Sequence, residues 1–218
     1  MSPRPYRLGQ RQVAIDQTRA RMIAAARDLL VSADPGRFSM DAVAQHADVS
    51  RATVYYQFRS RQGLIEALFD AAAAAGGMAG LPDAFGRPDP LAAVDDFVAV
   101  FGRFWGGDRR LHRRLHGLAA VDPDLGAALQ ARQERRRNGA TALVGRLTDE
   151  RGVPTAEAAP DVIDVLFTLT SFETFDTLAG SAKVPEAVTP LVQHLARAAI
   201  GLPAGRPASA RRRRIGPG

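Results

Sequence analysis

The sequence predicts an all-α protein, with an N-terminal three-helix domain followed by a larger helical domain. Between the glycine and proline breaks, apolar residues recur every three or four positions, the spacing that places them on one face of a helix. Nowhere do they alternate with polar residues over the length of a strand. Hydrophobic residues make up 46% and charged residues 24% of the 218 residues, a composition typical of globular domains.

Four helices are expected in the first 70 residues. The first is long, begins near Ile15 and has an apolar face formed by Ile15, Met22, Ala26, Leu29 and Leu30. Serines, which are favoured N-caps, precede the three later helices at Ser39, Ser50 and Ser60. These helices are expected at about 40–47, at about 51–56 and from 61 onward.

The first two short helices are joined by a tight turn. Asp48 lies where the chain must leave the helix, a position that needs the left-handed conformation favoured by glycine and tolerated by aspartate. Two helices separated by a turn of three or four residues form a helix-turn-helix, whose second helix can enter the major groove of DNA.

The second helix of this motif has an inward and an outward side. The inward set is expected to pack on Leu29 and Leu30 and comprises Val43, Ala44, Val49, Val54 and Phe58. The outward set comprises Arg51, Ala52, Thr53, Tyr55, Tyr56 and Gln57. Arginine can bind a guanine edge with two hydrogen bonds, and hydroxyl groups can bind bases or phosphates. Arg61, at the start of the next helix, is a candidate phosphate ligand.

Helix starts are also marked in the second half of the chain. Asp122-Pro123 and Thr189-Pro190 each combine an N-cap side chain with a proline in the first turn. One further helix is expected from Leu91. Another is expected from Pro160 to Ala179, after a short turn at 155–159.

Charge and breaker residues divide the chain into four expected segments. The net charge is +6, and the basic excess lies at the two ends of the chain. Glycine and proline are sparse up to about residue 76 and frequent thereafter. We expect a flexible basic arm, a helix-turn-helix domain, a larger helical domain and a disordered arginine-rich tail at 1–13, 14–70, 71–203 and 204–218.

Several classes of protein are disfavoured by the composition. The chain has no cysteine, which excludes disulfides and thiolate metal sites. No apolar run approaches the ~18 residues of a membrane span, and the N-terminus lacks a signal peptide's apolar centre. We expect a cytoplasmic protein without a membrane partner.

The segment VSRATVYYQFRSRQGLIEAL, at 49–68, resembles the signature of the TetR-type (tetracycline-repressor-like) regulators. The similarity extends over about 18–69 and implies that double-stranded DNA is a partner. It adds Ser39 and Met40 to the expected DNA contacts. Two positions depart from the pattern: Asp48 replaces the usual glycine, and Gly63 should cost its helix ~1 kcal/mol relative to alanine.

The same resemblance implies an Ω-shaped homodimer that is paired through its last two long helices. It also implies that a small-molecule effector binds among the middle helices of 71–203. Aromatic residues after position 90 fall in two clusters, each of which is either plain core or cavity wall. The expected effector-binding residues are Phe101, Phe104, Trp105, His116, Phe167, Phe172, Phe175 and Asp176. Glu173 and Asp176 either orient a ligand or face solvent.

The other charged or metal-ligating patterns are interpreted as structural or solvent-exposed and not as functional sites. His112 and His116 have the i, i+4 spacing of zinc ligands, but arginines and no acid stand between them. We interpret them as a solvated face with one half-buried histidine, and expect neither metal nor cofactor. Arg132 and 135–137 are interpreted as a solvated helix face. DNA contacts by the terminal arginines, Arg4, Arg7, Arg11 and Arg211 to Arg214, stay open.

Three functions are compatible with these patterns. The leading hypothesis is a homodimeric repressor that binds a palindromic operator and is released by an apolar or amphipathic effector. The second is a DNA-binding regulator without an effector. The third is a small-molecule-binding protein or enzyme in which the helix-turn-helix is only scaffold. No poised catalytic constellation is found, so we expect no enzyme activity.

Overall fold

The computed structural model describes residues 4–32 and 38–201, with side chains described from residue 12 onward. Every regular element within those residues is helical, which confirms the all-α class. The expected tail at 204–218 and the side chains of Arg4, Arg7 and Arg11 lie outside the described parts.

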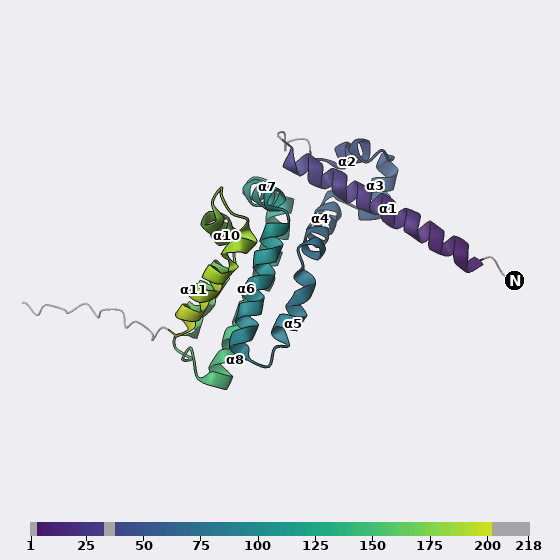
Figure 1. Ribbon diagram of the computed structural model, residues 1–218. Coiled ribbons are helices and arrows are strands. Elements are labelled where there is room, and N and C mark those ends of the chain that lie inside the picture. Colours follow the sequence, from purple (N-terminus) through teal and green to yellow (C-terminus); the bar gives the residue numbers. More distant parts are fainter. Residues whose placement is uncertain (1–3, 33–37, 202–218) are drawn as a thin grey trace, which may run out of the picture.

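The N-terminal end of the molecule consists of three helices and the start of a fourth. They are α1 (Arg4–Val31), α2 (Met40–His46), α3 (Arg51–Phe58) and α4 (Arg61–Ala75). Figure 1 shows α1 crossing the top of the molecule beside α2 and α3, while α4 descends from them into the second domain. The expected boundary of the N-terminal arm at residue 13 falls inside α1, which begins at Arg4 and has Pro5 in its first turn, where a proline fits a helix.

Serine caps begin each of the three short helices, as predicted. The hydroxyl oxygens of Ser39, Ser50 and Ser60 accept hydrogen bonds from the backbone N–H groups of Ala42, Thr53 and Gly63. Asp48 has φ of 52°, which confirms the left-handed turn. The helix α3 continues to Phe58, two residues beyond its expected end.

The second domain is built on long helices that lie side by side. In Figure 1, α6, α8 and α11 run lengthwise, and α7 crosses their upper end next to α1. Its elements are η2 (Met78–Gly80), α5 (Leu81–Phe85), α6 (Pro90–Gly107), α7 (Arg109–Ala119), α8 (Pro123–Arg151), α9 (Ala159–Leu169), α10 (Phe172–Ala179), η3 (Pro185–Val188) and α11 (Thr189–Gly201).

The single helix expected at 160–179 is wrong, because the chain breaks between α9 and α10. Ser171 caps α10 by accepting a hydrogen bond from the Thr174 N–H. The carbonyl of the buried Thr170, which is free at the break, accepts a hydrogen bond from Trp105 Nε1 at 3.0 Å. The break is therefore stabilised by a tertiary contact with α6.

Thr189 is not the N-cap that the sequence suggested. Its backbone is already helical, with φ of −50° and ψ of −47°, because η3 leads directly into α11. Its side chain is buried against Gly102 of α6, where any larger residue would overlap the threonine hydroxyl. This close approach packs α11 on α6.

Two hydrophobic clusters form the interior. The second lies among α6, α8, α9, α10 and α11. The first joins α1–α4 but also includes Leu111 and Leu115 of α7 and Leu125 of α8. The expected domain boundary at 70/71 falls inside α4. The helices α1–α4 therefore share their core with the second domain.

None of the described helices is by itself both long and apolar enough to cross a membrane. Only Arg61–Ala75 and Met78–Phe85 taken together, bent by 69°, meet the length and composition criteria.

Gly63 is required by the close approach of α4 to the end of α3. A Cβ at this position would overlap the Phe58 carbonyl oxygen. We expect Gly63→Ala to lower the free energy of unfolding by about 1–3 kcal/mol, because overpacking outweighs the ~1 kcal/mol gain in helix propensity. Urea unfolding at fixed protein concentration measures the change.

Gly117→Ala is the matched control for this prediction, since no atom beyond its own helix turn lies within 4 Å of the added Cβ. It should raise the unfolding free energy by up to ~1 kcal/mol. If Gly63→Ala were as stable as Gly117→Ala, the prediction would be wrong, because the end of α3 would then shift away from the added Cβ without a measurable cost.

Candidate nucleic-acid interface and effector cavity

The outward side of α3 is open to solvent, as the sequence predicted. Tyr56 is 74% and Tyr55 38% exposed, while Val54 and Phe58 are buried. Arg51 and Ala52 are also exposed, and Thr53 and Gln57 are half-buried. The predicted inward set packs in the first cluster, with Val49 partly buried. The helix therefore has one side anchored and the other available.

Arg51 is held in place by its neighbours on this surface. Its guanidinium lies 2.9 Å from Asp41 Oδ1 of α2 and 3.5 Å from the Tyr55 hydroxyl. Hydrogen bonding to Tyr55, followed by the charge of Asp41, raises the pKa of Arg51. The side chain thus stays charged and is oriented before any ligand arrives.

Two of the expected DNA contacts are placed elsewhere by the fold. Met40 is buried in the first cluster and cannot reach a duplex. Arg61 pairs with Asp122 and with Asp124, the latter at 2.8 Å, at the start of α8. Hydrogen bonding to Asp122 raises the pKa of Arg61, and Arg61 lowers that of Asp122. Arg61 therefore joins two domains instead of standing free for a phosphate.

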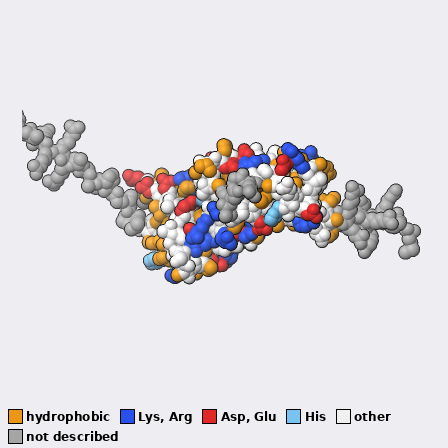
Figure 2. All heavy atoms as spheres, turned by 90° about the horizontal axis from the view of Figure 1, so that it is seen from above, with side chains coloured by type: hydrophobic (Ala, Val, Ile, Leu, Met, Phe, Trp, Pro, Cys, Tyr) orange, Lys and Arg blue, Asp and Glu red, His pale blue; other side chains and the backbone are white. Residues whose placement is uncertain are grey.

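Further arginines lie on the surface near this end. Arg59, which follows α3, is exposed and was missed because sequence spacing gave it no role. Arg110, Arg113 and Arg114 of α7 border a shallow hollow beside Val31 at the end of α1. Figure 2, which looks down on this end, shows basic side chains gathered in patches among acidic ones.

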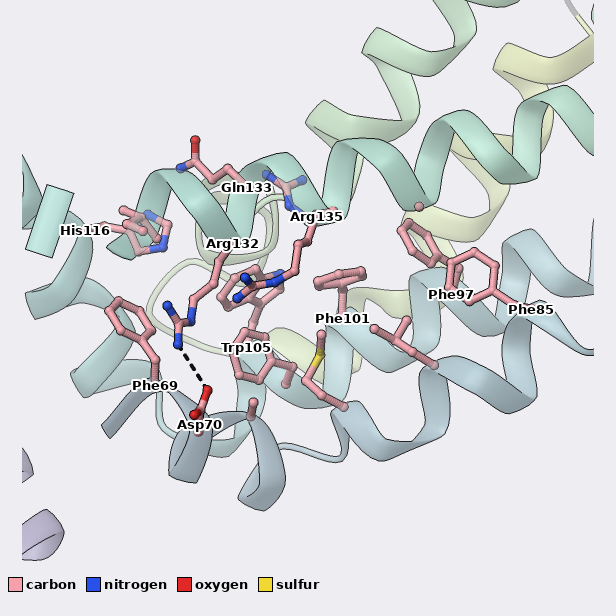
Figure 3. A pocket seen from close by; sticks show the side chains of 17 residues that line it. Phe69, Asp70, Phe85, Phe97, Phe101, Trp105, His116, Arg132, Gln133 and Arg135 are labelled. Atoms are coloured by element: carbon pink, nitrogen blue, oxygen red, sulfur yellow. Dashed lines mark hydrogen bonds and ion pairs between the residues drawn. The ribbon is translucent and has the colours of Figure 1, made fainter. Parts of the chain in front are cut away.

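A cavity of about 240 Å³ lies between α4, α5, α6 and α8. Figure 3 shows aromatic rings along it, with Phe69 from α4, Phe85 from α5 and three labelled rings from α6. Four of the expected effector-binding residues line it, namely Phe101, Phe104, Trp105 and His116. Lining residues that the sequence did not indicate include Phe69, Phe85, Phe97, Arg132 and Arg136.

The other four expected effector-binding residues do not line this cavity: Phe167 lies on α9, and the remaining three lie on α10, beyond the break. Phe167 is covered by the Arg136 and Arg137 guanidinium groups at 4.0 and 4.4 Å from the ring centre. Phe172 and Phe175 are buried in the second cluster. Asp176 pairs with Arg109 at 2.5 Å and with Arg113 at 3.0 Å.

The interpretation of His112 and His116 is wrong about the solvated face, but one of the two, His116, is half-buried as expected. His112 is buried, and its Nε2 donates to the Phe104 carbonyl at 3.2 Å. His116 is half-buried against Phe172 and lies 2.6 Å from Glu173 through Nδ1. Both point inward because α7 packs its histidine side on α6 and α10.

Burial, and to a smaller extent the neighbouring His116, lowers the pKa of His112 to about 4, against the opposing effects of the Phe104 carbonyl and Asp108. The unfolded value is about 6.5, so protonation favours the unfolded chain. The contribution of His112 to the free energy of unfolding is fully present above pH 6.5 and is lost as the pH falls toward 4. Over that interval we expect the wild type to lose up to about 3 kcal/mol more than His112→Gln, which keeps the donor.

Denaturant unfolding of both proteins at several pH values tests this prediction. Other titrating groups are common to the two proteins and cancel in the difference. Equal pH dependence of the wild type and His112→Gln would mean that His112 titrates normally in the folded protein.

The arginine run on α8 is not a solvated face throughout. Arg132 is half-buried over the Phe69 ring and pairs with Glu66 at 2.8 Å and Asp70 at 3.1 Å. Arg136 is only 8% exposed. Both arginines continue the inward stripe of α8 that includes Leu125, Ala128, Ala140 and Leu143, but their burial depends on the helices that cover this side of α8.

Comparison with known proteins adds a family match for the N-terminal part. Residues 22–68 match the model of "Bacterial regulatory proteins, tetR family". No curated protein sequence matches the chain.

Several solved structures share the fold over most of the chain. NalD, the secondary repressor of the MexAB-OprM multidrug efflux pump in Pseudomonas aeruginosa, is 16% identical, with a TM-score of 0.60 over 85% of this chain and 97% of that one. The fatty acid degradation regulator FadR from Bacillus halodurans is 15% identical, with 0.63 over 85% and 96%. PfmR from Thermus thermophilus, a TetR family transcriptional regulator, is 19% identical, with 0.57 over 80% and 96%.

Proposed function

We propose that the chain is a TetR-type transcriptional regulator and, more specifically, an effector-controlled repressor, because residues 22–68 match the tetR family model and most of the chain shares the fold of solved TetR-type regulators. In this proposal a homodimer occupies a palindromic operator. A small apolar or amphipathic molecule that binds in the cavity between α4, α5, α6 and α8, called here the α4–α8 cavity, releases the dimer from the operator.

The exposed side of α3 is the single observation that carries the DNA-binding part of the proposal. Arg51, Tyr55 and Tyr56 project from a helix whose opposite side is locked into the core. A two-fold dimer would present two such helices about 34–36 Å apart, or at a multiple of that spacing, to successive major grooves.

A second copy of the chain is the partner that the outer side of α9 and α11 fits. The two helices pack side by side, and α11 is apolar on both of its sides. Its inner residues are Val192, Ala196 and Ile200. Val165 of α9 and Leu191 and Leu195 of α11 remain exposed on the outside. Pairing of this face with its copy in a four-helix bundle would bury these side chains.

The effector part of the proposal follows from the position of α4. This helix lines the cavity through Phe69 and Ala73 and leads directly from the DNA-reading helix. Its first residue is tied to α8 through Asp122 and Asp124. A ligand that moves α4 relative to α8 would change the position of α3. Allosteric coupling is typically ~1–3 kcal/mol, a ~5–150-fold change in operator affinity.

Selection of bound fragments from a pool of random duplexes tests the proposal. We expect a palindrome with two half-sites that binds one dimer per duplex. The absence of enrichment over non-specific binding, or enrichment of one isolated half-site, contradicts it.

A thermal-shift screen with the selected duplex then tests effector control. A compound that binds the folded dimer raises its melting temperature and should also release the duplex. Enriched duplexes without any such compound would favour a regulator that is controlled by its own abundance.

A further inference from the structure

Arg136 is a buried cation without a carboxylate partner among the described residues. Its Nη1 donates to the Phe167 carbonyl and, at 3.1 Å, to the Thr170 hydroxyl, both of which are neutral groups. The side chain also lines the α4–α8 cavity. Arg132, one helical turn earlier, has two carboxylates within 3.1 Å. Both arginines thus line the cavity, but only Arg132 is neutralised by carboxylates in the described part of the chain.

A buried charge without a counterion is costly, so an unpaired arginine at a cavity wall needs an explanation. Burial lowers the pKa of Arg136 to about 10, which leaves it charged at neutral pH. Glu173 opposes this shift through space, but its Oε1 is already bound to His116 at 2.6 Å. Chiefly because of that hydrogen bond, the pKa of Glu173 is lowered to about 2, so Glu173 stays ionised and bound to His116.

His116 supplies a second unused polar group at the same cavity. Its Nδ1 is engaged by Glu173, while its Nε2 is buried and has no hydrogen-bond partner among the described groups. Figure 3 shows His116 at one end of the row of side chains that contains Arg132 and Trp105. Unsatisfied buried polar atoms are rare in folded proteins and frequently mark ligand sites.

Most of the remaining cavity wall is apolar, although Asp70, Arg132, Gln133 and Arg135 also line it. Phe97, Phe101 and Trp105 of α6 lie in series, with neighbouring ring centres 5.0 and 6.0 Å apart. Phe69 and Met78 continue this wall. A ligand that fills the cavity therefore meets aromatic surface over most of its length and, at α8, the buried Arg136 cation that lacks a carboxylate partner among the described residues.

We propose that the effector is an amphipathic organic anion, whose carboxylate or equivalent head binds Arg136 while its apolar body lies along Phe97, Phe101 and Trp105. This inference rests on the proposed effector-controlled function and specifies the ligand class. A neutral ligand would leave the guanidinium uncompensated, and a cationic ligand would be repelled by it. The unpartnered His116 Nε2 offers the ligand a second polar contact.

The chain carries its own probe for this test, because Trp105 is its single tryptophan and lines the cavity. The full-length protein is titrated with octanoate, octan-1-ol and octylammonium at constant ionic strength, and Trp105 fluorescence is recorded. We expect octanoate to bind at least ~10-fold more tightly than octan-1-ol, since hydrogen bonds to charged groups are the stronger kind. Octylammonium should bind more weakly than either.

Substitution of neighbouring arginines locates the effect. Arg136→Met should abolish the preference for octanoate over octan-1-ol, and Arg136→Lys should retain part of it. Arg137→Met makes the same charge change one residue away, where the native arginine pairs with Asp164 at 2.6 Å, and should keep the full preference. Circular dichroism establishes whether each variant folds. The wild-type comparison of the three probes requires no variant.

Three outcomes would overturn the inference: octan-1-ol binding as tightly as octanoate, no probe binding at all, or an octanoate preference that persists in Arg136→Met. If octan-1-ol binds and releases the selected duplex, effector control stands and only the anionic class is lost. If the wild type enriches no duplex, it is the proposed regulatory function that fails.

Discussion

Arg51→Ala is expected to lower affinity for the selected operator at least ~30-fold. Each dimer carries two copies of α3, so one substitution removes two contacts, and a bidentate arginine–guanine contact is among the most discriminating in DNA recognition. The loss should fall on one base pair of each half-site, where the variant tolerates other bases. Fluorescence anisotropy with the operator and its single-base variants measures both effects.

Tyr56→Phe separates base reading from phosphate binding on the same helix. Removal of its exposed hydroxyl should weaken binding to all sequences about equally, since a phosphate contact carries no sequence information. The charge-matched control for Arg51→Ala is Arg103→Ala, which removes an exposed arginine of α6 and should bind the operator like the wild type. Unchanged operator affinity in both Arg51→Ala and Tyr56→Phe would refute the reading role of α3.

Leu191→Glu combined with Leu195→Glu should convert the protein to a monomer and reduce operator affinity ~100-fold or more. Both leucines lie on the outer face of α11, so a symmetric dimer would bury four unpaired carboxylates. A monomer holds one half-site only and loses the gain from simultaneous binding, typically 10²–10⁴-fold. Analytical ultracentrifugation and operator titration give the two readouts.

Val121→Glu combined with Val184→Glu is the control for this pair. Both valines are exposed and lie outside α9 and α11, so the same charge change should leave the dimer intact. A Leu191→Glu and Leu195→Glu double variant that sediments as a dimer would place the subunit interface elsewhere.

Residues that act on their near neighbours were predictable from the sequence. A serine cap bonds to an N–H three residues away, and the left-handed turn at Asp48 depends on the residue itself. The apolar period separated Val54 and Phe58 from the exposed tyrosines of α3. The reading face of the candidate DNA interface was therefore predictable almost completely.

Residues that act across the fold were not predictable. Arg61 was expected at a phosphate but meets Asp122, 61 residues later. The break at Thr170 depends on Trp105 and Arg136, which lie on other helices. Three of the expected effector-binding residues, Phe172, Phe175 and Asp176, lie on α10 beyond this break and do not line the cavity.

The sequence by itself determined the fold class, the serine-capped starts of α2, α3 and α4 and the exposed side of α3, because these depend on interactions within a few residues. Only the tertiary structure decided which arginines face solvent and which face the cavity, because burial depends on what another helix covers. Arg136 and Arg137 are neighbours with the same side chain, and the packing of α8 on α9 leaves one exposed and the other enclosed.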